Sequence, residues 1–512
     1  MYKELKPVLI KSISPKLVAL SYEDTHVKDL GRQIIFVRKG GPADQVHFKS
    51  TEIVALDRIE PGTVGLTEFV FKSLGIDVDN PEPIHCSLEI RERPQTYNYI
   101  KAKMKKRDTV LTKQQIDAIV ADVVSGELSS LEKSAFLLSQ YYQDYNMDEI
   151  EHLCRAIATS GEVVDWSTTA YDKHSLGGVP GNKVTLLIVP IMAAAGLFIP
   201  KTSSRAITSP SGTADTMEAL GCNVSFTSEE IKEITRKAGG CIVWGGALNL
   251  APADDILIKE VEFPLGINPR SMMMASIMAK KYAQGIDFLV LDVPTGKGCK
   301  VTDLEEAQTL SRNFGELGRR LGIHVECGIT FGSLPVGHAI GPALEAREAL
   351  QALISPTTAS TSLVEKSTIL AGMGLEMSGK AVKGQGQAMA KEILYSGKAY
   401  QKMKQIIEAQ GGNPEMKPED VPIGKYTCEY RAPADGWPAD IDNTAVTLIA
   451  QTAGAPTDKG AGVHFIVKKE AVKAGDVIFR VHSSSPEKIA NVEAMLPKTK
   501  AIVIEGMLLG RV

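Results

Sequence analysis

The sequence has few aromatic residues, and its cysteines form neither a disulfide framework nor a zinc-ligand pattern. Phe, Trp and Tyr together make up 6% of the 512 residues. Seven cysteines lie scattered at positions 86, 154, 222, 241, 299, 327 and 428, and none belongs to a CxxC pair. An odd number argues against complete pairing, and free thiols fit a reducing compartment. The histidines and cysteines also lack zinc spacing, so we expect no bound metal.

Long hydrophobic runs are missing as well. The most apolar stretch, residues 185–200, is short for a membrane span and contains Pro190. The first ten residues, MYKELKPVLI, lack the apolar core of a signal peptide. These absences predict a cytoplasmic protein that has no membrane partner.

An excess of positive charge is also lacking. The formal net charge is −4, so no overall field draws the chain toward nucleic acid. A basic run at residues 101–107 has no interleaved aromatic side chains beyond Tyr97 and Tyr99 just before it. We interpret this run as the solvated start of a helix, and we expect no nucleic-acid partner.

The composition itself is that of a globular protein, with 44% hydrophobic and 23% charged residues in a chain too long for one core. Strand-like runs separated by turns predict a small N-terminal β module, and helical apolar spacing then predicts a bundle. The pattern predicts a multidomain α/β protein with four parts: a β-rich module at 1–90, a helical domain (first part) at 100–170, a central α/β phosphate-binding domain at 171–420 and an α+β domain at 421–512.

The central part alternates apolar runs with helical stretches. The runs Leu186–Ala195, Cys241–Trp244 and Phe288–Val293 are each followed by Gly-rich turns or helices. This rhythm favours an α/β layer with a ligand site at the strand ends. Short runs return near the C-terminus, among them Val446–Ala450 and Asp476–His482, and we expect strands there.

A glycine-rich segment, Lys173-His174-Ser175-Leu176-Gly177-Gly178-Val179-Pro180-Gly181-Asn182-Lys183, precedes an apolar run. Glycines let a backbone approach a ligand and present N–H groups to an anion, and the lysines, histidine and serine add charge and donors. The spacing is not that of a Walker loop. The alternative is a tight loop whose polar residues are incidental.

A second segment, residues 201–218, collects eight Ser and Thr side chains, Arg205 and the step Gly212-Thr213 before a helix. Hydroxyls and a guanidinium suit phosphate oxygens and sugar hydroxyls, although such a stretch can also be a plain polar loop. Asp215 and Glu218 fall in the first helical turn, where we favour a structural role with the helix dipole.

These residues resemble the thymidine/pyrimidine-nucleoside phosphorylase family. The resemblance rests on Ser203-Ser204-Arg205-Ala206-Ile207 with Gly212-Thr213-x-Asp215-x-x-Glu218, and on the Lys-His-Ser-x-Gly-Gly-Val loop. Further matches follow in order: Ala275–Lys281, Leu291-Asp292-Val293 with Gly296 and Gly298, Ala343-Leu344-Glu345, and Gly454 to Gly462. Together they cover about residues 105–495.

Several departures make the chain most similar to the AMP phosphorylase (type-2 thymidine phosphorylase) branch. The phosphate loop is longer, Ser209 stands where a histidine is usual, and Val261 stands where an arginine reads the pyrimidine. Lys300 replaces an apolar residue. An extra cation and more hydroxyls suit a 5′-phosphate, whereas losing the arginine relaxes recognition of the base.

The resemblance implies phosphorolysis of a nucleoside 5′-monophosphate (AMP, CMP or UMP) by inorganic phosphate, giving free base and ribose 1,5-bisphosphate. The alternatives are a pyrimidine nucleoside phosphorylase and a non-catalytic nucleotide sensor. The same fold supports Mg²⁺-dependent phosphoribosyltransferases such as the anthranilate enzyme, but no adjacent Asp-Glu pair lies near Gly212–Glu218. The resemblance further implies no cofactor, inorganic phosphate as co-substrate, and a homodimer or larger homo-oligomer.

The resemblance also assigns roles to individual residues. It implies that inorganic phosphate is bound by Lys173, Ser175, Ser203 and Thr213. The nucleotide would contact Gly178, Ser204, Arg205, Ala206, Ile207, Thr208, Ser209, Thr213, Ser276, Lys280 and Lys300.

The sequence offers several candidates for the acid that protonates the leaving base. The branch places an aspartate where this chain has Asn268, and an amide cannot transfer a proton at neutral pH. His174, Asp254 or Asp255 would then supply the proton, or a hydrogen bond from Asn268 would suffice.

Overall fold

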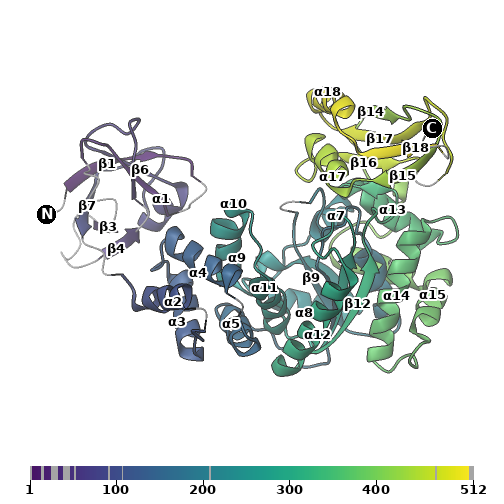
Figure 1. Cartoon of the computed structure of the whole chain (residues 1–512), viewed down its shortest axis with the longest axis horizontal. Helices are drawn as coiled ribbons and strands as arrows, with labels where there is room; N and C mark the ends of the chain where they lie inside the picture. Colours follow the sequence, from purple (N-terminus) through teal and green to yellow (C-terminus); the bar gives the residue numbers. More distant parts are fainter. Residues whose placement is uncertain are drawn as a thin grey trace, which may run out of the picture. The chain divides into compact units, whose positions relative to one another are not determined.

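The computed structural model describes residues 3–12, 16–24, 33–37, 46–50, 53–89, 93–106, 108–143, 145–206, 209–467 and 470–506. The chain divides into two compact units (Figure 1). One comprises Met1–Glu162 with Ala251–Lys280, and the other comprises Val163–Leu250 with Lys281–Val512. The sequence places residues 251–280 in the central α/β domain, whereas in the structure they pack with the first unit. The helical pattern of these residues does not reveal which neighbours they pack against.

The first unit begins with the expected β module. Its seven-stranded sheet has the order β4-β3-β7-β1-β6-β2-β5, with bounds β1 Lys3–Leu9, β2 Val18–Leu20, β3 Gln33–Val37, β4 Val46–Ser50, β5 Ile53–Ala55, β6 Thr63–Leu66 and β7 Ile84–Glu89. Helix α1, Glu68–Leu74, adds Val70 and Phe71 to an apolar core with Val18 and Val64. The small β domain predicted from alternating runs is therefore confirmed.

The rest of the first unit is helical, as predicted: α2 Gln95–Lys105, α3 Lys113–Ser125, α4 Ser130–Tyr142, α5 Met147–Thr159, α9 Pro252–Leu257, α10 Phe263–Leu265 and α11 Arg270–Ala283. Helix α3 begins with a capping box formed by Thr112 and Gln115. Thr112 Oγ1 accepts from Gln115 N at 3.3 Å, and Gln115 Oε1 accepts from Thr112 N at 3.0 Å. Such reciprocal bonds satisfy donors that a helix start leaves open.

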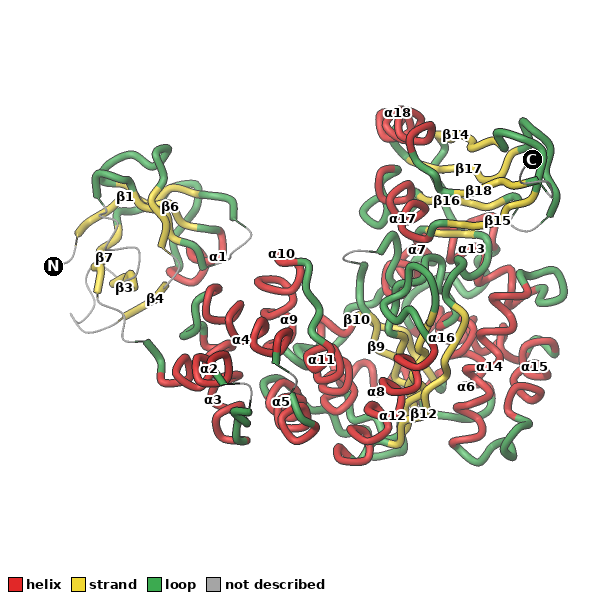
Figure 2. The backbone as a smooth tube through the Cα atoms, viewed as in Figure 1, coloured by secondary structure: helices red, strands yellow, loops and turns green. Residues whose placement is uncertain are grey.

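Five parallel strands form the centre of the second unit (Figure 2). They are β8 Tyr171–Ser175, β9 Ile199–Ser203, β10 Gly240–Trp244, β11 Phe288–Thr295 and β12 His324–Phe331. Strand β11 pairs with β8 and β12, and β9 pairs with β10. A parallel bridge between Ala170 and Phe198 links the two sets.

Helices accompany these strands: α6 Thr185–Ala194, α7 Thr213–Ala219, α8 Ser228–Ala238, α12 Leu304–Leu321, α13 Pro342–Ile354, α14 Thr361–Met377, α15 Gly386–Tyr395 and α16 Lys398–Ala409. Helices α13 and α15 pack against α6 and α16. The apolar runs at 241–244 and 288–293 are strands, whereas the run at 186–195 is helix α6. Every residue from Thr185 to Ala193 is buried, so the helix is apolar on all sides. Such a run shows no period that separates helix from strand.

The last part of the chain forms the expected α+β layer: β14 Tyr426–Arg431, β15 Trp437–Ile441, β16 Gly462–Phe465, β17 Val477–Ser483 and β18 Ile502–Glu505, with helices α17 Asn443–Thr452 and α18 Pro486–Met495. Strand β13, Ala339–Ile340, pairs with β16 and joins this sheet to the central part. The strand expected at 446–450 is wrong. Asp442 caps α17, and Val446, Ile449 and Ala450 share its buried face.

In the described part of the chain, no helix is long and apolar enough to cross a membrane.

One carboxyl group in the second unit is buried without an ion pair. Glu345, in the first turn of α13, is 4% exposed and accepts a hydrogen bond from Gly341 N at 3.1 Å. Burial raises the pKa of this carboxyl to about 7, although Lys183 opposes the shift. The native chain therefore holds the Glu345 proton more tightly than the unfolded chain, whose carboxyl titrates near 4.5.

This difference predicts how stability depends on pH. Because the native pKa lies above the unfolded one, the Glu345 contribution is complete below about pH 4.5 and is lost as pH rises toward 7. Each unit of pKa difference corresponds to about 1.4 kcal/mol. Glu345→Gln keeps an oxygen for Gly341 N and cannot ionise. We expect its melting temperature, relative to wild type, to rise between pH 5 and pH 8 in thermal scans. A difference that stays constant with pH would contradict the burial argument.

Candidate active site

The two segments singled out in the sequence follow neighbouring strands. The loop 176–182 follows β8, and the loop 204–212 follows β9. A third loop, 296–300, follows β11. The strands run parallel, so these loops lie at the edge formed by their carboxyl ends, where open α/β sheets bind ligands.

A buried carboxylate, Asp292, lies on β11 opposite Ser175 of β8. Ser175 Oγ donates to Asp292 Oδ2 at 2.8 Å, and Thr330 Oγ1 of β12 donates to Oδ1 at 2.6 Å. Lys366 Nζ lies 3.1 Å from Oδ2. Burial alone would raise the Asp292 pKa, but the charges of Lys366 and Lys173 outweigh it and lower that pKa. The carboxylate stays ionised and connects three strands with α14.

Lys173 is the second charged group at this position. Its side chain is buried, with 2% of the residue exposed. Burial lowers the pKa of its ammonium to about 8, although Asp292 acts in the opposite direction, and the like charge of Lys366 lowers the pKa further. An ammonium with this pKa begins to lose its proton just above neutral pH. An anion beside it would favour the charged form.

The glycine-rich loop is held by Ser175. Its Oγ accepts from Gly177 N at 3.3 Å and from Asn182 Nδ2 at 3.2 Å. Gly177 and Gly178 both have positive φ, 79° and 87°, which favours glycine at these positions. These contacts give the loop one compact conformation.

Lys183, at the end of the loop, is fully buried and anchors it. Its Nζ donates to Val336 O at 2.9 Å and to Glu348 Oε2 at 2.6 Å. Burial acts to raise the pKa of Glu348, but Lys183 and the side chain and amide of His338 outweigh it and lower that pKa. Lys183 is therefore a structural lysine, although its place in the motif resembles that of a ligand-binding one.

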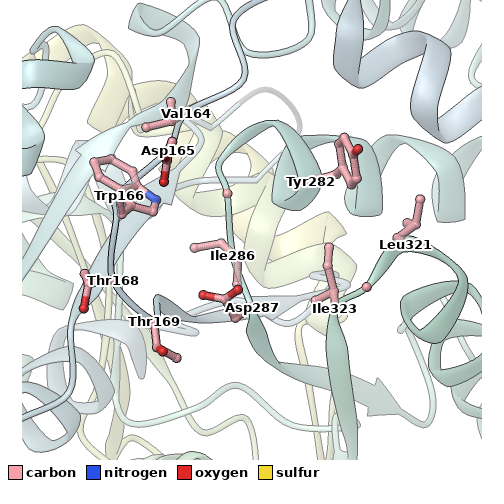
Figure 3. Close-up of a pocket in the computed structure, with 12 residues that line it drawn as sticks. Val164, Asp165, Trp166, Thr168, Thr169, Tyr282, Ile286, Asp287, Leu321 and Ile323 are labelled. Atoms are coloured by element: carbon pink, nitrogen blue, oxygen red, sulfur yellow. The ribbon is translucent and has the colours of Figure 1, made fainter.

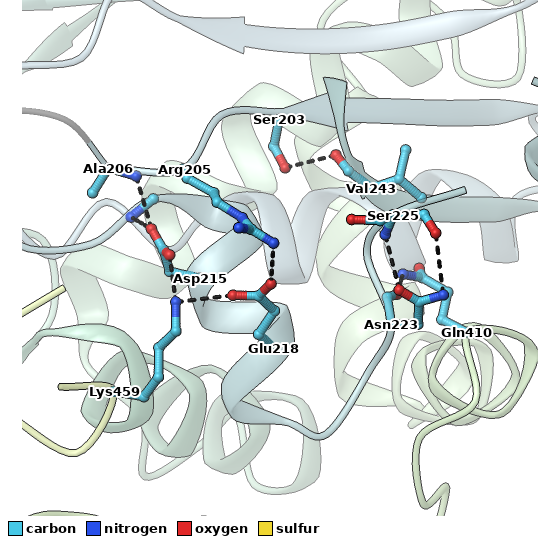
Figure 4. Close-up of polar contacts among 11 residues, drawn as sticks. Ser203, Arg205, Ala206, Asp215, Glu218, Asn223, Ser225, Val243, Gln410 and Lys459 are labelled. Atoms are coloured by element: carbon cyan, nitrogen blue, oxygen red, sulfur yellow. Dashed lines mark hydrogen bonds and ion pairs between the residues drawn. The ribbon is translucent and has the colours of Figure 1, made fainter. Parts of the chain in front are cut away.

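Asp215 closes the second segment on itself (Figure 4). Its Oδ2 accepts from Ala206 N at 2.8 Å and from Gly212 N at 3.0 Å, which joins the two ends of the loop. Lys459 Nζ lies 2.5 Å from Oδ1. A Cβ at Gly212 would lie 2.6 Å from Ser204 O, so the close approach needs glycine. The structural role favoured for Asp215 fits these contacts.

Arg205 is held by its neighbours as well. Its Nη2 donates to Glu218 Oε1 at 2.5 Å, and its guanidinium lies 4.3 Å from the centre of the Trp244 ring. Lys459 also contacts Glu218, at 2.9 Å (Figure 4). The Arg205 side chain remains partly exposed, so it can still meet a ligand.

The other residues predicted for this edge lie on the same loops. Ser203 Oγ donates to Val243 O at 3.0 Å, and Ser209 Oγ donates to Ser211 O at 3.0 Å. Gly178 packs against Cys299 and Lys300, whose backbone N would lie 3.3 Å from an added Cβ. Ser204 is exposed, His174 and Thr213 are half-buried, and Ala206 bonds to Asp215. Ile207 and Thr208 lie outside the described residues.

Five predicted residues belong to the first unit: Asp254, Asp255, Asn268, Ser276 and Lys280. Asp254 is buried, and Lys280 Nζ lies 2.5 Å from its Oδ2. Burial acts to lower the pKa of Lys280, but Asp254 outweighs it and raises that pKa. Asn268 is exposed before α11, and Ser276 is half-buried within it. The predicted site residues thus form two sets, one in each unit.

Three contributors received no role from the sequence: Asp292, Lys366 and Lys459. Asp292 is part of a motif that resembles the family, but a lone aspartate in an apolar strand does not reveal its partners. Lys366 lies inside a helical pattern, and Lys459 belongs to a distant domain. Only the fold brings them to the loops.

A cavity of about 430 Å³ lies elsewhere in the second unit (Figure 3). Its lining includes Trp166, Thr169, Tyr282, Asp287 and Ile323. These residues precede the first residues of β8, β11 and β12, so the cavity lies at the amino ends of the strands. None of the predicted site residues lines it.

The described residues contain no group of three or more His, Cys, Asp or Glu side chains arranged to hold a metal ion.

Three family models match consecutive parts of the chain. Residues 97–161 match the helical bundle domain of a glycosyl transferase family, and residues 167–400 match its α/β domain. Residues 437–503 match the pyrimidine nucleoside phosphorylase C-terminal domain. A crystal structure of anthranilate phosphoribosyltransferase from Thermus thermophilus has a TM-score of 0.52 and 20% identity, and covers 61% of this chain and 99% of that chain. This likeness concerns the fold alone.

Curated relatives are similar over most of the chain. The AMP phosphorylase of Thermococcus kodakarensis is 52% identical over 82% of this chain and 83% of its own. Those of Methanosarcina barkeri and Methanocaldococcus jannaschii are 47% and 46% identical, each over 92% of this chain and 93% of their own. At this identity and coverage, the chain belongs to the AMP phosphorylase family.

Proposed function

We propose that this protein is a pentosyltransferase that cleaves AMP with inorganic phosphate, giving adenine and ribose 1,5-bisphosphate. The observation that carries the proposal is the similarity to AMP phosphorylases over about nine tenths of the chain. The buried lysines beside the glycine-rich loop support it, because they provide the positive charge that a phosphate dianion needs.

In this reaction a phosphate oxygen forms a bond to C1′ while the bond from C1′ to the base nitrogen breaks. The electron pair leaves with the base, which takes up a proton. The sugar becomes cation-like on the way, so a phosphate held close to C1′ stabilises it as well as attacking it. The protein must therefore fix the phosphate, fix the ribose and neutralise the departing base.

We assign the phosphate to Lys173, Ser175, Ser203 and Thr213, around the ends of β8 and β9. The nucleotide contacts Gly178, Lys300 and the loop that Asp215 closes, which includes Ser204, Arg205 and Ser209. We also assign the nucleotide to Ser276 and Lys280 of the first unit. The hydroxyls and Lys300 suit a 5′-phosphate.

Among the acids considered, Asp254 is the least suited to give a proton, because its carboxylate is already paired with Lys280. Burial raises the pKa of its neighbour Asp255, which makes that carboxyl a better donor. His174 remains the candidate on the phosphate side. Asn268 donates a hydrogen bond to the base without transferring a proton.

We also infer that the chain assembles as a homodimer or a larger homo-oligomer. Helix α4 leaves Leu131, Tyr141 and Tyr142 exposed, and large exposed apolar side chains are a feature of subunit contacts.

The substrate class is tested by incubating the protein with inorganic phosphate and, separately, AMP, CMP, UMP, thymidine and uridine. We expect free base from the nucleotides, AMP above all, and little from the nucleosides, when products are separated by chromatography. Release from thymidine or uridine alone would show a nucleoside phosphorylase instead. Nucleotide binding without base release would favour a sensor.

The Lys173 ammonium predicts a pH dependence. Because the Lys173 pKa is about 8, its charge is present below this pH and is lost as pH rises through it. The charged groups that act on it are Asp292, Lys366, Asp172 and Lys201. We expect kcat/KM for phosphate to fall about tenfold per unit above pH 8. In Lys173→Arg, whose side chain stays charged, kcat/KM for phosphate should no longer fall above pH 8. A variant with the same pH profile as wild type would contradict the assignment of Lys173 to phosphate.

Asn268→Asp tests the interpretation of the base site. The side chain is exposed, so the change should not disturb folding, and either group can hydrogen-bond to the base. We expect kcat with AMP to stay within about tenfold of wild type. Asn268→Ala, which removes the hydrogen bond, should lose more. An inactive Asp variant would show that the amide itself is required.

A further inference from the structure

Lys366 occupies an unusual position for a lysine. It lies on α14, which packs against β11. The residue is 8% exposed, and its Nζ is buried. Nζ lies 3.1 Å from Asp292 Oδ2, yet it donates no well-formed hydrogen bond to any described residue. A buried ammonium has three protons to place, and unplaced ones are costly.

The charges around Asp292 do not balance. Lys173 and Lys366 both act on this one carboxylate. Lys173 Nζ has no ion pair with any described residue. The nearby carboxylate of Asp172 is already paired with Lys281 at 2.5 Å and with Lys201 at 3.5 Å. The Asp292 cluster, defined as Lys173, Lys366 and Asp292, thus has one positive charge in excess in a buried place, which an anion would neutralise.

The Ser175 hydroxyl beside this cluster already takes part in three hydrogen bonds. Ser175 Oγ gives its only proton to Asp292 and accepts from Gly177 N and Asn182 Nδ2. Ser175 can therefore donate to phosphate only by giving up its hydrogen bond to Asp292. The two ammonium groups are therefore the donors at this point that remain available to an anion.

We propose that Lys366 is a binding residue for inorganic phosphate, acting together with Lys173 across Asp292. The two ammonium groups take the phosphate dianion, and Asp292 keeps them charged and in place before it arrives. The inference rests on the proposed phosphorolysis for the identity of the anion, but the binding step can be measured without turnover. No covalent step involves Lys366.

The direct test measures binding of inorganic phosphate alone to the full chain by calorimetry. Lys366→Met should weaken binding at least about tenfold, since a hydrogen-bonded charge pair is lost. The matched control is Lys380→Met, which removes one positive charge just after the same helix from an exposed side chain. It should stay within about twofold of wild type. In turnover, KM for phosphate should rise in Lys366→Met while KM for AMP changes far less.

A second variant separates contact with phosphate from mere neutralisation of Asp292. Asp292→Asn keeps an acceptor for Ser175 or Thr330 and removes the negative charge. If Lys366 only balanced Asp292, the double variant Lys366→Met with Asp292→Asn would recover wild-type phosphate affinity, and the proposal would be overturned. If Lys366 contacts phosphate, the double variant stays as weak as Lys366→Met. The double variant also has no unbalanced carboxylate, so it remains measurable if the single variant fails to fold.

The outcomes also distinguish this inference from the proposed function. If wild-type protein bound phosphate through Lys366 but released no base, the proposed phosphorolysis would be overturned and the Lys366 phosphate site would stand. If Lys366→Met kept normal turnover and unchanged phosphate affinity, the Lys366 proposal would be overturned and the phosphorolysis would stand. Wild-type protein that does not bind phosphate would overturn the Lys366 proposal.

Discussion

The buried Asp292 carboxylate is the interaction on which the candidate site depends. It lies on the middle strand of β12-β11-β8 and binds Ser175 and Thr330 on both sides, with Lys366 of α14 above it. An ionised carboxylate in this position is tolerated because two lysines face it. The charge of this carboxylate in turn favours the charged form of Lys173 before any substrate binds. Preorganised charge of this kind is what stabilises developing charge in a reaction.

A second, separate network shapes the nucleotide side of the site. Asp215 ties the two ends of the loop after β9, and Lys459 fastens Asp215 and Glu218 from the C-terminal part of the chain. Lys459 O in turn accepts from Ala343 N, the second residue of α13. The C-terminal α+β layer therefore contributes to the geometry of the loop, although none of the residues that we assign to the ligand belongs to this layer.

The sequence predicted the fold class, the two loops and the family, because each has a local signature. Glycines before an apolar run and hydroxyls before a helix start are visible without a structure. What depends on packing was not visible. The apolar run at 186–195 became a helix, the run at 446–450 became α17, and residues 251–280 joined the first unit. Lys183, which appeared to belong to the anion loop, is a buried anchor, whereas Lys366 received no role.

The measurement that tests the account most directly is a crystal structure of the protein with inorganic phosphate bound. The account predicts an anion at the carboxyl ends of β8 and β11, within hydrogen-bond distance of both Lys173 Nζ and Lys366 Nζ. A phosphate that binds only at the loop after β9, or away from these strand ends, would contradict it.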